Sequence, residues 1–599
     1  MRHRTSGSLA TQPQTLAKGL PTLQAHWPVG IGLTCLALAT VYQLLCTMQP
    51  IAFLNQHVLV MDDVYYYFQV ARNLALNGRA TFDGLHTTSG IQLLWGLLLW
   101  LVALVNSDKV GFIRAVLVLS TLLNGIAGLA LWRLGRDLYS GEVGDLAALF
   151  WSGFMVALSP MMIGLEYPLH MLTAVAITAV CWWMFVERQA APALLRLLLL
   201  GVLLTVNYWV RLDSALISLL IWWGVGVLLF RRRTSARSFA AGMAALTLPP
   251  VLGAVVYVAT CWRLARTVVP VSGMVKRYYA TQHFRGYSWR TSLAGHVFWW
   301  VRIESRALLD VFYSSLLAGH RPLGEPVPLV ALGLILLATA TTVRRLVIGD
   351  TDDPRRRRAA VFLGLLWLLG SLHAALVVTT IGHFSDVTQH YYAWLWIACC
   401  LWTALMVQSF LSRLSSPGVQ RQAVIVGLVA FLALHAWDGL GRFVVYSSPN
   451  LHNRRLPVMK WIAEHLPPDA RIGAWNAGQL GYFCDRTIVN LDGLANDRHY
   501  LRYLLRGTPI RDYLAAEHID YLIDVNEPDL TMPFRASWDH ARLFRNTLLW
   551  SELEPLYVEE GQEEPIVVVR LREAQRTTDG GERVRSQSQA AAPASRRSN

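Results

Sequence analysis

Apolar runs of about 20 residues recur along the sequence and leave few folds available to it. Crossing the hydrocarbon core of a bilayer takes roughly 17–25 residues of helix. Eleven runs reach or approach that length, so we expect a mainly α-helical membrane protein with about eleven spans. The runs cover residues 28–46, 111–132, 145–163, 170–186, 195–210, 214–230, 238–260, 326–345, 359–380, 390–411 and 422–438.

The composition and the placement of charge argue against a soluble globular protein and against a nucleic-acid-binding protein. Charged residues make up only 15% of the chain and apolar residues 54%, whereas soluble globular chains carry about 25% charged residues. The formal net charge of +14 would suggest a nucleic-acid partner in a soluble protein. Here the basic residues flank apolar runs, where they act as topology signals, so no nucleic-acid partner is expected.

A twelfth, shorter apolar run at residues 91–105 decides the topology. If it crosses the membrane, the basic loops around Arg231–Arg233 and Arg355–Arg358 face outward, against the positive-inside rule. If it lies in the outer interface, those loops face the cytoplasm. The second assignment predicts a multi-pass protein of the inner (plasma) membrane with a cytoplasmic N-terminus and an extracytoplasmic C-terminal domain.

The chain divides into four parts. Residues 1–27 and 573–599 are polar and are expected to be disordered. Residues 28–446 form the membrane module, with large outer loops at 47–110 and 261–325. Alternating strand and helix signals predict a soluble α/β domain over 447–572. Its expected strands are 471–475, 487–491, 521–525 and 566–571, and its expected helices are 457–465 and 509–518.

The first outer loop contains an acidic pair, Asp62-Asp63, at the start of a helical run that ends at Gly78. One aspartate is explained as a helix cap. Two adjacent carboxylates near a bilayer repel each other and lose solvation, so a cap and a catalytic role are equally good interpretations. On helical spacing Asp63 shares a face with Tyr66 and Tyr67.

Further charged side chains are placed on the same outer side by this topology. Taken singly, each is explained as a solvated loop charge or an interfacial anchor. A transporter would place such groups near the midplane, so their collection at one side favours chemistry at the outer interface on an amphipathic substrate. They are Glu166, Arg211, Asp213, Lys276, Arg277, Arg285, His383 and His390.

These motifs resemble those of the GT-C superfamily of membrane glycosyltransferases. After the aspartates come Ala71-Arg72-Asn73, Phe82-Asp83-Gly84 and Thr88-Ser89-Gly90, and the Arg211-Leu212-Asp213 turn is similar to an Arg-x-acid element of bacterial members. The layout from residue 28 to about 260 follows the transmembrane module of that superfamily, and C-terminal α/β domains are common in it. The resemblance is closest to bacterial arabinofuranosyl- and aminoarabinose-type transferases.

The resemblance implies transfer of a sugar from polyprenyl phosphate to a hydroxyl of a glycan, lipid or protein. Asp62 or Asp63 would be the general base; Asp63 is slightly preferred because it lies nearer the tyrosines, but the pair is not separated. Cations would face the leaving phosphate, and the prenyl tail would lie along 91–105. The candidate binding residues are Tyr66, Tyr67, Arg72, Arg211, Asp213, Lys276, Arg277, Arg285, His383 and His390.

The sequence departs from the superfamily in its second outer loop. Oligosaccharyltransferase-type members carry an acid-x-acid element there that helps to bind a divalent metal, whereas this chain offers only Glu166. No metal ligand is therefore assigned, and a divalent cation is kept only as an alternative. Glu166 could orient the acceptor, hold Arg211 or cap a helix. Asp492, at the end of an expected strand, could touch the acceptor.

Two other functions fit the same features. A flippase or transporter of a lipid-linked glycan would also use lipid-facing grooves and many spans. A non-catalytic envelope scaffold would use the α/β domain to bind a partner. Exchange of both aspartates for asparagine separates these hypotheses, because only the transferase depends on a carboxylate base.

Overall fold

The structure of the chain is a computed structural model. It describes residues 30–59, 61–157, 163–186, 194–232, 235–284, 354–381, 392–412, 417–444, 451–525, 534, 548–562 and 564–572. The expected span at 326–345 and the two polar termini lie outside these residues.

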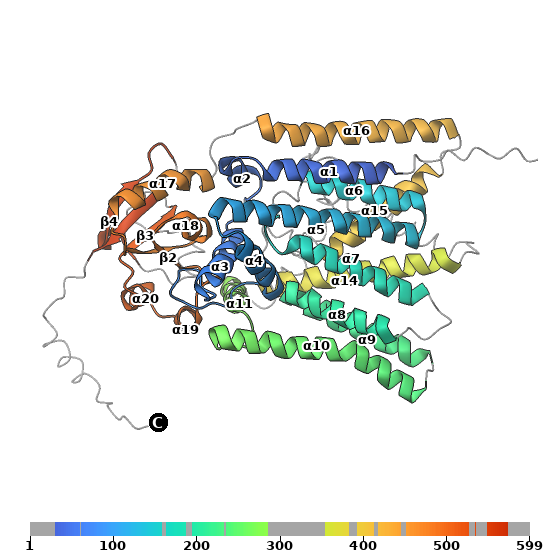
Figure 1. Cartoon of the computed structure of the whole chain (residues 1–599), viewed down its shortest axis with the longest axis horizontal. Helices are drawn as coiled ribbons and strands as arrows, with labels where there is room; N and C mark the ends of the chain where they lie inside the picture. Colours follow the sequence, from blue (N-terminus) through green and yellow to red (C-terminus); the bar gives the residue numbers. More distant parts are fainter. Residues whose placement is uncertain are drawn as a thin grey trace, which may run out of the picture.

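Long helices lie side by side in one bundle (Figure 1). Every expected span other than 326–345 falls on one of them. By length and hydropathy, six helices of the described residues could cross a membrane alone, namely α5, α7, α9, α10, α15 and α16, so the total of eleven spans is not confirmed. The bundle helices are α1 (Ile31–Thr47), α5 (Lys109–Leu138), α6 (Gly141–Ala157), α7 (Tyr167–Val186), α8 (Leu194–Val210), α9 (Ala215–Arg231), α10 (Ala236–Ala265), α14 (Pro354–Ile381), α15 (Ala393–Leu411) and α16 (Pro417–Val444).

Burial along the helices separates the centre of the bundle from its outer face. Every residue of α15 from Ala393 to Leu405 is buried, as expected for a helix that is apolar on all sides and lies in a core. On α10, by contrast, Val251, Leu252 and Val255 are exposed. Large apolar side chains on the outside of a bundle are stable where lipid, rather than water, surrounds them. The described part of the chain is therefore a multi-pass membrane protein.

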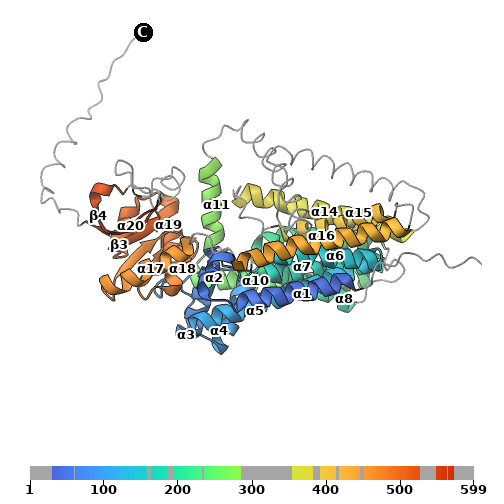
Figure 2. The same cartoon turned by 90° about the horizontal axis from the view of Figure 1, so that it is seen from above.

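Four short helices gather at one end of the bundle, between it and the C-terminal domain (Figure 1): α2 (Ile51–His57), α3 (Asp63–Asn77), α4 (Leu93–Val105) and α11 (Val271–Phe284). Helix α4 corresponds to the apolar run at 91–105 and has 13 residues, too few to cross the hydrocarbon core. It buries Trp95 and Leu99. Figure 2 shows α11 standing across the direction of the bundle helices.

Basic residues gather at the opposite end of the bundle. Arg136 lies in the last turn of α5 and Arg231 in that of α9, and Arg357 and Arg358 lie in the first turn of α14. On each of these three helices, the basic residues lie at the end that is remote from α3 and α11 (Figure 1). This separation is the one that the positive-inside rule produces, and the orientation relative to the cell stays a prediction.

The C-terminal domain is built on a five-stranded sheet in the order β2-β1-β3-β5-β4. Strands β2, β1 and β3 are parallel, whereas β5 pairs antiparallel with both β3 and β4. The strands are β1 (Arg471–Ala474), β2 (Thr487–Asn490), β3 (Tyr521–Val525), β4 (Leu553–Val558) and β5 (Ile566–Leu571), and the helices are α17 (Leu451–His465), α18 (Gly478–Phe483), α19 (Arg498–Arg506) and α20 (Ile510–Ala516).

Four of these strands lie where the sequence patterns place them, and β4 was not predicted. The reason is Pro555, which cannot donate a ladder hydrogen bond and reads as a strand breaker. Strand β4 tolerates this proline because it is at the sheet edge, where the register shifts between Pro555 and Tyr557.

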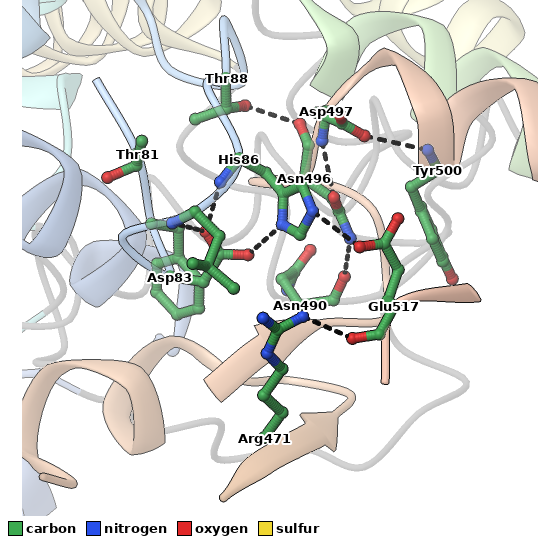
Figure 3. A network of polar contacts seen from close by, with 12 residues as sticks. Thr81, Asp83, His86, Thr88, Arg471, Asn490, Asn496, Asp497, Tyr500 and Glu517 are labelled. Atoms are coloured by element: carbon green, nitrogen blue, oxygen red, sulfur yellow. Dashed lines mark hydrogen bonds and ion pairs between the residues drawn. The ribbon is translucent and has the colours of Figure 1, made fainter. Parts of the chain in front are cut away.

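A polar network joins the domain to the first outer loop (Figure 3). The His86 ring lies 2.6 Å from Asp83 Oδ2 through Nδ1 and 3.0 Å from Glu517 Oε2 through Nε2. Nearby, the Thr88 hydroxyl donates to the carbonyl of Asn496 at 2.8 Å. The loop and the domain are thus tied by buried and partly buried polar contacts as well as by apolar packing.

This network makes the stability of the docked domain depend on pH. Burial lowers the pKa of His86, but the hydrogen bond and charge of Asp83, with the charges of Asp497 and Glu517, raise it to about 9. Since the folded-state pKa exceeds the unfolded value of about 6.5, protonated His86 stabilises the fold fully below pH 6.5 and loses this effect as pH rises through 9.

We therefore expect His86→Gln to destabilise the protein at pH 6 by at most about 3 kcal/mol, and the difference from wild type to shrink by pH 9.5. Thermal unfolding of the purified protein between pH 6 and 9.5 measures it. His518→Gln provides the control, because it makes the same substitution at an exposed histidine outside this network. A His86→Gln deficit that stays constant over this range would contradict the assignment.

Candidate active site

A cavity of about 400 Å³ lies between the end of the bundle and the C-terminal domain. This volume is within the usual range for small-molecule sites. Helices α3, α9, α11 and α14 contribute to its wall, together with short loops and Leu494 of the domain. Eight residues expected at the site from the sequence line it: Asp63, Tyr66, Tyr67, Glu166, Arg211, Asp213, Lys276 and Arg277.

Asp63 presents its carboxylate to the cavity from the first turn of α3. The side chain is 37% exposed, and its Oδ2 lies 3.9 Å from Lys276 Nζ on α11. Loss of solvation raises the pKa of Asp63, Lys276 lowers it, and the neighbouring carboxylates of Asp62 and Glu166 raise it further. The result is a reachable carboxylate with a pKa above its ordinary value, which suits a general base.

Asp62 points away from the cavity and into the C-terminal domain. Its oxygens accept hydrogen bonds from the backbone N–H groups of Gly478 at 2.6 Å and Gln479 at 3.0 Å, at the start of α18. Arg455 Nη1 lies 3.0 Å from Oδ1. The Asp62 side chain makes no capping bond in its own helix. The sequence slightly preferred Asp63 without separating the pair, and the structure gives the two side chains different surroundings: Asp63 lines the cavity and Asp62 holds the domain.

The contact at Asp62 depends on a glycine. A Cβ added at Gly478 would lie 2.2 Å from the backbone oxygen of Asp62, far inside van der Waals contact. Gly478 is the first residue of α18, which follows β1 in the chain. The absence of a side chain here allows the first N–H groups of α18 to approach the start of α3.

Arg211 lines the cavity and is held between two carboxylates. Its Nη1 donates to Glu166 at 2.5 Å, and Nε and Nη2 both donate to Asp213 at 3.1 Å. The side chains of Arg211, Glu166 and Asp213 are only 3%, 5% and 11% exposed. Of the roles weighed for Glu166, the contacts correspond to holding Arg211. Two carboxylates already offset the charge of this guanidinium, so Lys276 and Arg277 are the cavity cations better placed to meet an anion.

One member of this cluster was missed by sequence reasoning. His373 Nε2, from the middle of α14, lies 3.4 Å from Asp213 Oδ2, and the side chain is fully buried. Its neighbours in the sequence are almost all apolar, so no local pattern indicated a polar role. Its isolation inside a predicted span was the one available signal, since ionisable residues within spans are expensive to keep.

Of the remaining binding candidates, Arg72 is the one within the described residues, and it does not line the cavity. Arg72 donates from Nε to the carbonyl of Ser107 at 3.0 Å and lies 5.3 Å over the ring of Tyr482, so its side chain supports the loop before α5. Arg285, His383 and His390 lie outside the described residues. Among the residues that the structure describes, no three His, Cys, Asp or Glu side chains are grouped as metal ligands.

Comparison with known families gives one match. A family model described as a domain of unknown function (DUF8728) matches residues 449–566, which is most of the C-terminal domain. Among curated proteins, none matches the sequence significantly.

The solved structures that resemble this chain include an oligosaccharyltransferase and ArnT. The oligosaccharyltransferase of Archaeoglobus fulgidus, tethered with an acceptor peptide, has 11% identity and a TM-score of 0.48 over 90% of this chain and 74% of that chain. ArnT from Cupriavidus metallidurans, bound to undecaprenyl phosphate, has 13% identity and a TM-score of 0.38 over 91% and 98%. Scores below 0.5 do not establish a common fold, so the proposal below rests on the geometry of the cavity.

Proposed function

We propose that this chain is a GT-C-type glycosyltransferase that moves a sugar from a polyprenyl-phosphate donor to an acceptor hydroxyl. The reaction would take place on the face of the membrane that carries the C-terminal domain. The observation that supports this most is the pairing of Asp63 and Lys276, whose charged groups lie 3.9 Å apart in one cavity at the end of the bundle.

Asp63 suits activation of the acceptor hydroxyl, and Lys276 suits stabilisation of the leaving phosphate. Asp63 accepts the proton of the acceptor hydroxyl while that oxygen forms a bond to the anomeric carbon. The bond between the anomeric carbon and the phosphate oxygen breaks, and polyprenyl phosphate leaves with the electron pair. Lys276 and Arg277, on consecutive positions of α11, offset the charge that develops on the phosphate.

The location of the cavity suits a substrate carried by lipid. Its wall contains residues of α9 and α14, so a phosphate bound there can stay joined to a prenyl chain between the helices. Each buried CH₂ of such a chain contributes about 0.8 kcal/mol to binding. An oxygen-rich sugar would lie toward Tyr66 and Tyr67, and the acceptor would enter from the side of the domain.

The decisive experiment compares the envelope glycans of cells with and without this protein. Under the proposal, loss of the protein removes one sugar from an envelope glycan, lipid or protein, and the matching polyprenyl-phosphate sugar accumulates. Wild type expressed from a plasmid restores the sugar. Unchanged envelope glycans in the deletion strain would sink the proposal.

A reconstitution experiment separates a transferase from a flippase of a lipid-linked glycan. With purified protein in liposomes, a transferase yields glycosylated acceptor when donor and acceptor are supplied on the same face as the C-terminal domain. A flippase yields no such product and moves the lipid between leaflets instead. Formation of product on one face therefore supports the transferase.

The pairing of Asp63 with Lys276 also predicts a shift in the pH–rate profile. Because Lys276 lowers the pKa of Asp63, Lys276→Met raises that pKa. The acid limb of the profile, which reports deprotonation of the base, therefore moves to higher pH. Arg277→Met is the matched control: it removes the adjacent cation, and we expect a lower rate with the acid limb in place. An unmoved limb in Lys276→Met would exclude Asp63 as the titrating base.

A further inference from the structure

We propose that Asp492 of the C-terminal domain is a positioning residue that fixes the separation of α3 and α11 across the cavity. The inference rests on the proposed function in that α3 carries the proposed base and α11 the proposed cations. Two independent hydrogen bonds, one to each helix, place Asp492 between them.

The first bond reaches α3. The Tyr66 hydroxyl donates to Asp492 Oδ2 at 2.5 Å and accepts from the Ala477 N–H at 2.9 Å and from Asn490 Nδ2 at 3.0 Å. The ring of Tyr66 lines the cavity. Tyr66 is three residues beyond Asp63, so the two side chains share a face of α3. The bond therefore holds the helix one turn from the proposed base.

The second bond reaches α11. The Tyr279 hydroxyl donates to the backbone carbonyl of Asp492. Tyr279 is three residues beyond Lys276, again one helical turn from the residue that faces the cavity. The carboxylate of Asp492 thus binds one helix and its backbone carbonyl binds the other. A shift of this residue changes the distance between Asp63 and Lys276.

The loop that carries Asp492 is itself fixed. Asp492 accepts from the N–H groups of Leu494 at 3.0 Å and Asn476 at 3.1 Å. The next residue, Gly493, has φ of 79°, and a Cβ there would lie 2.7 Å from the Tyr500 ring. Leu494 then reaches the cavity wall. A rigid loop of this kind can transmit the position of the domain to both helices.

The carboxylate of Asp492 loses solvation in its buried position, which is unfavourable for its charged form. Asp492 is buried, and burial raises its pKa to about 6 although the hydrogen bond from Tyr66 lowers it. An asparagine of the same shape would avoid the loss of solvation. The charged form is the stronger acceptor for a tyrosine hydroxyl, which is what a positioning bond requires.

The test uses the full-length protein with spin labels at exposed positions of the two helices. Leu76→Cys on α3 and Thr281→Cys on α11 are both on the surface, in a background whose seven native cysteines are replaced by serine or alanine. Pulsed electron spin resonance measures the distance distribution between the labels. We expect Asp492→Asn and Tyr279→Phe each to broaden this distribution relative to the unmodified background.

A neighbouring tyrosine provides the matched control. The Tyr278 hydroxyl is buried without a hydrogen-bond partner among the described residues, so Tyr278→Phe removes the same atom from the same helix without cutting the tie to Asp492. We expect its distance distribution to match the background. Thermal unfolding of each variant identifies any that does not fold, and Tyr279→Phe, which leaves Asp492 itself intact, then carries the test.

Transfer rates supply the second readout. A displacement of about 1 Å in a reacting group costs up to about 10²-fold in rate, so we expect Asp492→Asn and Tyr66→Phe to lower kcat by tenfold or more, with KM changed less than threefold. The double variant Asp492→Asn/Tyr66→Phe should be no slower than the slower single variant, because each substitution removes the same hydrogen bond between these two residues.

The outcomes separate this inference from the proposed function. If Asp63→Asn abolishes transfer while the Asp492 variants keep both the rate and the distance distribution of wild type, positioning by Asp492 is wrong and the proposed function stands. A lower rate with an unchanged distance distribution also overturns it. If Asp63→Asn has no effect on transfer, the proposed function fails, and the distance distributions still decide the role of Asp492.

Discussion

Replacement of Asp63 by asparagine should lower the rate of sugar transfer by about 10²–10⁴-fold, the usual contribution of a general base. Asparagine has nearly the same shape and keeps a polar group in the cavity, but it cannot take the proton of the acceptor hydroxyl. Single-turnover transfer by the purified variant, with enzyme in excess over the donor, measures the chemical step without a contribution from product release.

The adjacent aspartate provides the matched control. Asp62→Asn removes an equal charge one residue away, from a side chain that binds Gly478, Gln479 and Arg455 instead of facing the cavity. We expect transfer to stay within tenfold of wild type and the thermal unfolding temperature to fall. The reverse pattern, with transfer lost in Asp62→Asn and kept in Asp63→Asn, would show that the roles of the two carboxylates have been interchanged.

Replacement of Arg211 by methionine should destabilise the protein by about 3–5 kcal/mol, the cost of leaving buried charge uncompensated. Glu166 and Asp213 both lose their counter-ion in this variant, and both side chains are nearly inaccessible to water. Thermal unfolding in detergent and the yield of folded protein measure the effect. Arg211→Lys should recover part of it, because lysine keeps the charge but not the two-pronged geometry of arginine.

A triple variant tests the cause of this loss. Glu166→Gln and Asp213→Asn combined with Arg211→Met leave no uncompensated charge, so the triple variant should be more stable than Arg211→Met alone. Were Arg211→Met as stable as wild type, water would have to reach the cluster and the buried pair would contribute little.

The bundle and much of the domain could be predicted from the sequence because their signals are local. A run of 20 apolar residues specifies a helix wherever it lies, and β1, β2, β3 and β5 each lie on a predicted strand. The run at 91–105 was separated from the true spans by charge alone, and α4 is indeed too short to cross a bilayer.

The candidate site was predictable only as a list of residues. Topology brought Asp63, Glu166, Arg211 and Lys276 to one end of the bundle, and the structure places them around one cavity. Their partners were not predictable, because a contact such as that of Tyr66 with Asp492 spans 426 residues of sequence. No local pattern states which of two consecutive aspartates faces the cavity, since that choice depends on where the domain docks.

The order of the strands has a consequence for the synthesis of the protein. Strand β5, the last to leave the ribosome, lies inside the sheet between β3 and β4, so the domain cannot close until residue 571 has been made. Leu494 reaches the cavity wall, and Asp492 its partners on α3 and α11, only as part of that closed domain. A nascent chain therefore meets its lipid neighbours with an unfinished pocket, and any activity begins only after translation of the domain is complete.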